Sequence, residues 1–151
     1  LLCDISLRRS DAAAAITWID AHVPPHRRDA SLWRRLGDAL RAAGHADKAM
    51  AAWDNALRKD RGGRHLTLVR LGELCLERGE HGRAEDAFRK AADFCRTRYM
   101  RDDPRALAGL SRALEARGNR EELARVQARL AKTRATEPPP LDDDALLEDI
   151  A

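Results

Sequence analysis

The stretch LWRRLGDALRAAGHADKAMAAWDNAL, residues 32–57, decides the fold. In each half, apolar and small residues are spaced so that they share one face of a helix, and a glycine separates the halves. The first-half positions are Trp33, Leu36, Gly37 and Leu40, the turn is Gly44, and the second-half positions are Ala49, Trp53, Ala56 and Leu57. Two helices joined by a short glycine-containing turn form a helical hairpin.

The same pattern recurs along the chain with a period near 35 residues. Thirty-five residues on, the equivalent positions are Leu68, Leu71, Gly72, Cys75, Gly79, Ala84, Phe88 and Ala91. After a further 39 residues, a weaker copy contains Leu107, Leu110, Ser111, Leu114, Gly118, Leu123, Gln127 and Leu130. Upstream, part of a copy contains Leu1, Ile5, Ala14, Trp18 and Ala21, with Arg9 at the turn. This period and alternation indicate a solenoid of helical hairpins.

These residues resemble the tetratricopeptide repeat family, whose pattern pairs W-x2-L-G-x2-Y with A-x3-F and a later proline. The resemblance covers roughly residues 1–134. It implies an all-α, right-handed solenoid of stacked antiparallel hairpins, with about three full repeats and a truncated first one. The chain departs from the family at Leu40, Cys75 and Leu114, where the family prefers Tyr, and it lacks a proline after the first full copy. Gly62 and Gly63 are expected to end that helix with a left-handed cap instead.

Capping residues and prolines predict where the helices begin and end. Ser10 or Asp11 is expected to cap a helix that runs to His22, before Pro24 and Pro25. The later helices are expected at about 32–43, 46–60, 66–78, 83–99, 105–117 and 120–134. The helix over 83–99 should be longer by about one turn, because the repeat interval grows there by four residues.

Composition limits the class of protein. The 151 residues are 44% hydrophobic, 4% aromatic and 35% charged, a mix that suits one domain of helices packed through small residues. No apolar run reaches the roughly 18 residues of a membrane span, and no signal segment is recognisable. The first residue is Leu1, not Met, which suggests an excised fragment. Three cysteines (Cys3, Cys75 and Cys95) without C-x-x-C spacing favour a reducing, cytoplasmic location, and Cys75 is expected in the core.

The chain changes character after residue 136. Residues 1–136 are expected to form the repeat domain, and residues 137–151 a proline-rich linker followed by an acidic amphipathic tail. The net charge of +3 divides into +9 for the domain and −6 for the tail. Leu146, Leu147 and Ile150 could form a capping helix for the last hairpin or a segment that lies in a groove, and a disordered tail is the third alternative.

No arrangement of residues predicts catalysis, a cofactor, a metal or a small-molecule substrate. His22 and His26 have the spacing of a metal pair, but the two prolines between them break the helix that would align them. His45 and His81 follow the turn glycines and are interpreted as exposed turn residues. No nucleophile elbow, P-loop or dinucleotide motif is present. The chain is therefore expected not to be an enzyme.

The first helices of stacked hairpins line an inner groove in this family, and that groove is the expected partner-binding surface. Its residues are expected to be Arg34, Asp38, Arg41, Val69, Glu73, Leu76, Ala108, Arg112 and Glu115. Trp18, Trp33, Trp53 and Phe88 are instead expected in the core, because they fall at repeat positions.

The favoured function is a non-catalytic scaffold that binds another protein or peptide, or a second copy of itself. Its support is the repeat pattern, which does not identify the partner. One alternative is a regulatory arm of a larger enzyme, suggested by the abrupt N-terminus. Another is nucleic-acid binding through the basic domain, but interspersed acids and the scarcity of aromatic residues argue against it.

Overall fold

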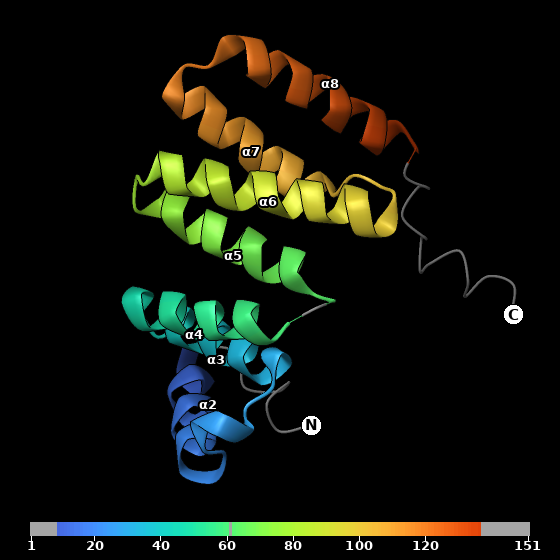
Figure 1. Cartoon of the computed structure of the whole chain (residues 1–151). Helices are drawn as coiled ribbons and strands as arrows, with labels where there is room; N and C mark the ends of the chain where they lie inside the picture. Colours follow the sequence, from blue (N-terminus) through green and yellow to red (C-terminus); the bar gives the residue numbers. More distant parts are fainter. Residues whose placement is uncertain (1–8, 61, 137–151) are drawn as a thin grey trace, which may run out of the picture.

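All regular structure in the described part of the chain is helical. The computed structural model describes residues 9–60 and 62–136 and contains seven α-helices and one short 3-10 helix there, without a strand. The elements are α2 (Arg9–His22), η1 (Pro25–Arg27), α3 (Ala30–Ala42), α4 (Ala46–Lys59), α5 (Arg64–Glu77), α6 (His81–Tyr99), α7 (Pro104–Arg117) and α8 (Arg120–Thr136). They follow one another along the molecule, mostly packed against their neighbours in sequence (Figure 1). The all-α prediction is confirmed for these residues.

Equivalent tight turns join α3 to α4, α5 to α6 and α7 to α8. Gly44, Gly79 and Gly118 have φ angles of +86°, +73° and +73°, in the left-handed region that favours glycine. After each glycine, the next backbone N–H donates to a carbonyl one turn before it. The accepting residues are Leu40, Cys75 and Leu114, with N–O distances of 2.8, 2.8 and 3.1 Å. This is the Schellman helix ending, and it confirms the predicted turn glycines.

Two aspartates cap the first turns of helices. The Asp29 side chain accepts a hydrogen bond from Leu32 N at 2.7 Å, and the Asp103 side chain accepts one from Arg105 N at 3.0 Å. Pro104 is the first residue of α7, where its missing N–H leaves no bond unmade. The 19 residues of α6 against 14 in α5 confirm the predicted extra length.

Large rings pack directly against glycines in the core. Trp53 and Phe88 are 0% and 1% exposed. Trp53 of α4 lies on Gly37 of α3, and its Nε1 donates to Arg34 O at 3.2 Å. A Cβ placed on Gly72 would lie 2.8 Å from the Phe88 ring, and one on Gly109 would overlap the same ring. Phe88 of α6 is therefore enclosed between glycines of α5 and α7.

The expected first partial copy is wrong in its register. Ala14, Trp18 and Ala21 are exposed, and Trp18, at 43%, stacks on His22 instead of entering the core. The residues of α2 that are buried are Ala12 and Ile19, on a different stripe of the helix that packs against α3. The pattern could not reveal this, because α2 is rich in alanine and more than one stripe is apolar.

The expected boundary at the start of α2 is also wrong. Arg9 and Ser10 are already helical, so there is no turn at Arg9 and no cap at Ser10 or Asp11. A serine inside a helix costs only a few tenths of a kcal/mol relative to alanine, which is too little to keep the helix from including Ser10. The predicted helical positions Leu1 and Ile5, together with Cys3, lie outside the described residues.

Two details further along differ from expectation. Neither Gly62 nor Gly63 has a positive φ; instead α4 ends at Lys59, and Asp60 Oδ1 accepts hydrogen bonds from both glycine N–H groups at 2.8 Å. An Asx-type turn thus replaces the left-handed cap. In α8, Gln127 is exposed and its neighbour Val126 is buried at 3% in its place. Among the described helices, none is both long enough and apolar enough to cross a membrane.

Candidate functional site

Three helices that are not consecutive in sequence, α3, α5 and α7, contribute to one charged face. Asp38, Arg41, Arg70, Glu73, Glu77 and Arg105 line a shallow hollow of about 510 Å³ there, with Ala42. Asp38, Arg41 and Glu73 are among the residues expected in the groove, and the structure brings these three together. We call these six charged side chains the charged face.

Ion pairs within the charged face link the three helices. Arg70 Nε lies 2.7 Å from Asp38 Oδ1, which joins α5 to α3. Glu73 of α5 accepts from Arg105 of α7 at 2.9 Å and lies 3.4 Å from Arg41 of α3, which also pairs with Glu77. The cations of this face already have partners, so a ligand must compete with internal ion pairs. Such exposed or half-exposed pairs contribute only about 0–1 kcal/mol each, so they can be exchanged.

Asp38 is the most enclosed acid of this face. Burial raises the pKa of its carboxyl group, although the neighbouring Arg70 and Arg34 guanidinium groups act in the lowering direction. Its side chain is 22% exposed. The pairing with Arg70 keeps the carboxylate occupied, so Asp38 is better suited to holding α3 against α5 than to recruiting a cation from a partner.

The remaining groove candidates lie in different surroundings. Arg34 pairs with Asp60 at 3.3 Å, outside the hollow. Val69 is 3% exposed and belongs to the core instead of facing solvent, while Leu76 and Ala108 are half-buried.

Arg112 and Glu115 are exposed on α7, and neither has an ion pair within the described part of the chain. They follow Arg105 at helical spacing and extend the charged face along α7. Leu146, Leu147 and Ile150 lie outside the described residues.

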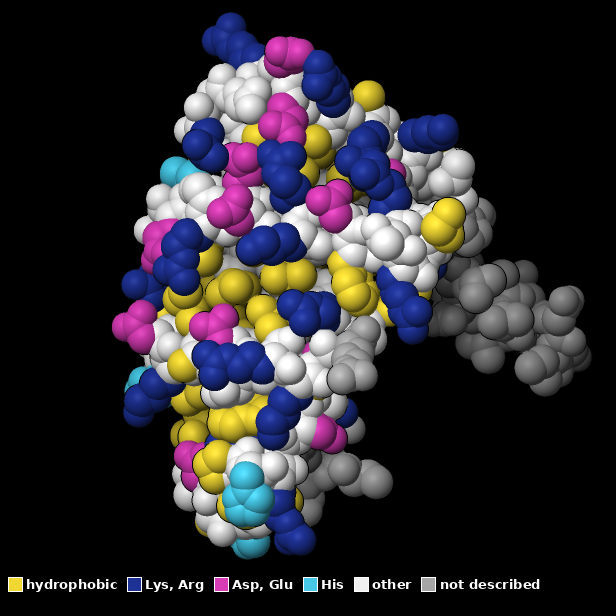
Figure 2. Space-filling model, viewed as in Figure 1, with side chains coloured by type: hydrophobic (Ala, Val, Ile, Leu, Met, Phe, Trp, Pro, Cys, Tyr) yellow, Lys and Arg dark blue, Asp and Glu magenta, His cyan; other side chains and the backbone are white. Residues whose placement is uncertain are grey.

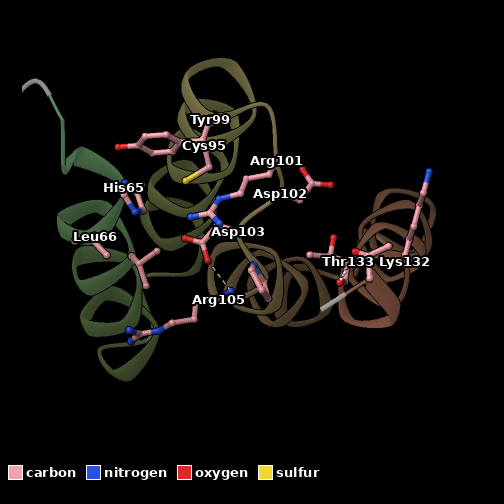
Figure 3. A pocket seen from close by; sticks show the side chains of 13 residues that line it. His65, Leu66, Cys95, Tyr99, Arg101, Asp102, Asp103, Arg105, Lys132 and Thr133 are labelled. Atoms are coloured by element: carbon pink, nitrogen blue, oxygen red, sulfur yellow. Dashed lines mark hydrogen bonds between the residues drawn. The ribbon is translucent and has the colours of Figure 1, made fainter. Parts of the chain in front are cut away.

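A second hollow lies where α5 begins, α6 ends and α7 begins. Its volume is about 580 Å³, and we call it the helix-end pocket (Figure 3). It is lined by His65, Leu66, Val69, Cys95, Tyr99, Arg101, Asp102, Asp103, Pro104, Arg105, Lys132, Thr133 and Thr136. Sequence reasoning missed it, because its polar residues come from separate segments and form no short motif.

The helix-end pocket contains a buried thiol next to an imidazole and a carboxylate. Cys95 is 3% exposed, and burial, followed by the nearby Asp103 carboxylate, raises its pKa to about 11. His65 stacks on Phe94 at 6.0 Å between ring centroids and meets Tyr99 edge-on at 5.5 Å. Asp102, in the same wall, is held by Arg129 at 2.5 Å. The thiol, the imidazole and the carboxylate therefore lie among side chains that are packed or held by ion pairs.

His22, His26, His45 and His81 do not assemble into a site. α2 ends at His22 and His26 lies in the separate 3-10 helix η1, so the two histidines are not on one helix, as predicted. The ring nitrogen Nδ1 of His22 lies 2.9 Å from Trp18 O. His45 is exposed, as expected, whereas His81 is half-buried.

Charge on the visible face of the molecule is mixed. Lys and Arg side chains are interspersed with Asp and Glu, and hydrophobic side chains gather at the surface in the region of α4 and α5 (Figure 2). Nucleic-acid interfaces instead gather cations on one face or along one helix. This face therefore does not have the distribution of charge that the nucleic-acid alternative requires.

Comparison of the sequence with models of known protein families finds no match. A search of curated proteins likewise finds no matching sequence.

Proposed function

We propose that this chain is a non-catalytic scaffold of the tetratricopeptide type, a right-handed solenoid that binds a partner peptide or protein, or a second copy of itself. The observation that carries the proposal is that the first helix of each hairpin ends in the same glycine turn. Left-handed glycines with the same hydrogen bond follow one another after 35 and 39 residues. Such units need neighbours to bury their apolar sides, and their stacking creates extended binding surfaces.

The charged face is the proposed binding surface. Side chains of both signs alternate along it, so an extended partner with alternating charges could replace the internal ion pairs one by one. Arg112 and Glu115 offer charges that need not first be released from an internal pair. Half-buried Leu76 and Ala108 could add apolar contact area beside them.

A charge swap tests the surface without changing net charge or internal ion pairs. Arg112→Glu combined with Glu115→Arg reverses the local pattern on α7. The matched control is Asp86→Lys with Lys90→Asp, on exposed residues of α6 that also lack ion pairs within the described segments. Partners captured from extract by the immobilised wild-type chain would be compared across the three proteins, and self-association would be measured by sedimentation.

The expected result is capture or self-association by wild type and control, with a loss of at least about tenfold in the swap variant, since like charges across an interface cost more than 1 kcal/mol. Equal binding by all three proteins would refute the charged face, with its extension along α7 through Arg112 and Glu115, as the binding surface. Retention of nucleic acid alone, with affinity that falls steeply with salt, would refute the scaffold proposal in favour of the basic-domain alternative.

A further inference from the structure

Three side chains of types that commonly bind metals converge in the helix-end pocket. His65 belongs to the first turn of α5, Cys95 to the last turns of α6, and Asp103 is the residue before α7. One donor atom from each, an imidazole nitrogen, the thiol sulfur and a carboxylate oxygen, lies within 4.8 Å of the other two. Residues far apart in sequence thus present nitrogen, sulfur and oxygen donors toward one point (Figure 3).

Each of the three side chains has binding capacity that the fold does not use. The Nδ1 atom of His65 is buried without a hydrogen-bond partner in the described part of the chain. Cys95 is a free, buried cysteine. Asp103 Oδ1 accepts from Arg105 N, and its carboxylate retains further lone pairs. A buried polar atom without a partner is unfavourable, so an ion bound at Nδ1 would remove that cost.

The imidazole is held in place by its neighbours. Phe94 and Tyr99 pack against the His65 ring from two sides, and the Tyr99 hydroxyl donates to Gly62 O at 2.5 Å. Asp103 is likewise fixed by its role as the helix cap. A donor that is already oriented loses less entropy when it binds a ligand.

The spacing of the donors is close to that of a four-coordinate site. With zinc–sulfur and zinc–nitrogen bonds of about 2.3 and 2.0 Å, tetrahedral ligands lie roughly 3.5 Å apart. Donors separated by up to 4.8 Å must each move inward by at most roughly 0.7 Å. Rotation of the Cys95 side chain, which no described hydrogen bond fixes, can supply most of this movement without a change in the helices.

We propose that His65, Cys95 and Asp103 bind one divalent transition-metal ion of the zinc class. Thiolate and imidazole donors select zinc over magnesium or calcium, which prefer oxygen ligands. Three protein ligands leave a fourth coordination position, which would be filled by water or by a side chain from a partner in the 580 Å³ pocket. The ion would join the ends of α5, α6 and α7. This inference does not depend on the proposed scaffold function.

Arg101 allows a test that separates metal binding from a structural role, because its positive charge would repel a cation bound in the same pocket. It lines the same pocket, is exposed and has no ion pair within the described residues. Its guanidinium acts to lower the pKa of the Cys95 thiol, as a nearby positive charge does. Arg101→Gln should therefore tighten metal binding several-fold, whereas a purely structural arginine would not affect it.

The experiment measures zinc binding to the metal-free, reduced full chain by competition with a chromophoric chelator. We expect one equivalent per chain, and His65→Gln or Cys95→Ala should weaken affinity by more than about 100-fold, the upper limit for losing an outer-shell group. Asp103→Asn keeps the helix cap, because asparagine caps as well as aspartate, and should weaken binding less. Cobalt(II) should give a thiolate-to-metal charge-transfer band in wild type that is absent in Cys95→Ala.

Matched controls remove the same donor types elsewhere. Cys75→Ala removes the other described cysteine, which is buried at 1%, and His81→Gln removes a second histidine whose Nδ1 is buried without a partner in the described segments. Both controls, and Cys3→Ser, should leave zinc affinity unchanged, and far-UV circular dichroism would verify their folding. Equal zinc affinity in wild type and Cys95→Ala overturns the proposal. If Cys95→Ala does not fold, a wild-type cobalt spectrum without the thiolate band overturns it.

Discussion

Alanine at Gly109 should destabilise the chain although alanine favours helices. Gly109 lies inside α7, where Gly→Ala by itself stabilises by about 1 kcal/mol. However, its new Cβ would overlap the Phe88 ring, whose side chain is 1% exposed and cannot swing into solvent. Overpacking of this kind costs about 1–3 kcal/mol, and the larger overlap is expected at the upper end. The net expectation is a loss of about 2 kcal/mol, or roughly 4–8 °C in melting temperature.

Two further glycines make this prediction quantitative. At Gly72 a Cβ would lie 2.8 Å from the same ring, against about 3.5–4.0 Å for an unstrained contact, so Gly72→Ala should lose less, about 1 kcal/mol. Nothing lies within 4 Å of a Cβ on Gly82, near the start of α6, and Gly82→Ala should stabilise by about 0.4–1 kcal/mol. From most to least stable, the expected order is therefore Gly82→Ala, wild type, Gly72→Ala and Gly109→Ala.

The assay is urea unfolding followed by far-UV circular dichroism, with Phe88→Leu as the second partner of a double-mutant cycle. Leucine keeps the site apolar but removes the ring atoms that Cβ meets, so Gly109→Ala should be less harmful in that background by about 1–3 kcal/mol. A Gly109→Ala variant as stable as Gly82→Ala, or a cycle without coupling, would show that α6 and α7 do not meet through Phe88 and Gly109.

Two other predictions follow from burial and charge. Trp53→Ala should cost about 3–5 kcal/mol of unfolding free energy because the ring is 0% exposed. Trp18→Ala, on a side chain that is 43% exposed, should cost under about 1 kcal/mol. Similar melting temperatures for the two variants would contradict the placement of Trp53 in the core and of Trp18 at the surface. The hydrogen bond from Arg89 lowers the pKa of Glu122 below its ordinary value of 4.5, so Glu122 contributes stability above that pH, and the contribution is lost as pH falls through the folded-state pKa. Glu122→Gln should therefore be less stable than wild type at pH 7 by under about 1 kcal/mol, and this difference in unfolding free energy should disappear below pH 4.5. In the control Glu121→Gln, whose side chain is 80% exposed, the difference should be close to zero at both pH values. A difference for Glu122→Gln that does not change with pH would contradict the contribution of its ionised carboxylate.

The hairpins were predictable because their signals are local. A glycine at Gly44 or Gly79, with apolar residues at helical spacing on both sides, describes a complete turn within a dozen residues. Asp29 and Asp103 likewise mark helix starts through hydrogen bonds that span only two or three residues. Where the chemistry of a boundary is contained in adjacent residues, the sequence alone suffices to place it.

Positions that depend on a neighbouring helix were less predictable. Gly109 contacts Phe88 across two helices, although the repeat pattern places Ser111 at the equivalent position. Ser111 instead donates its hydroxyl hydrogen to Leu107 O at 3.0 Å, which uses its polar group inside its own helix. The interval of 39 residues shifts the small residue relative to the template, so the close contact is made by Gly109.

The extra residues in α6, before the third copy, also explain why the two candidate surfaces differ. The 19-residue helix α6 extends past the start of α5, and its last turns carry Cys95 and Tyr99 beside His65. In the preceding hairpin the 14-residue helix α4 ends earlier, and Asp60 closes the chain tightly onto Gly62 and Gly63. A regular interval of 35 residues would end α6 about one turn sooner, near Cys95. The irregular spacing that weakens the repeat pattern is therefore the feature that forms the helix-end pocket.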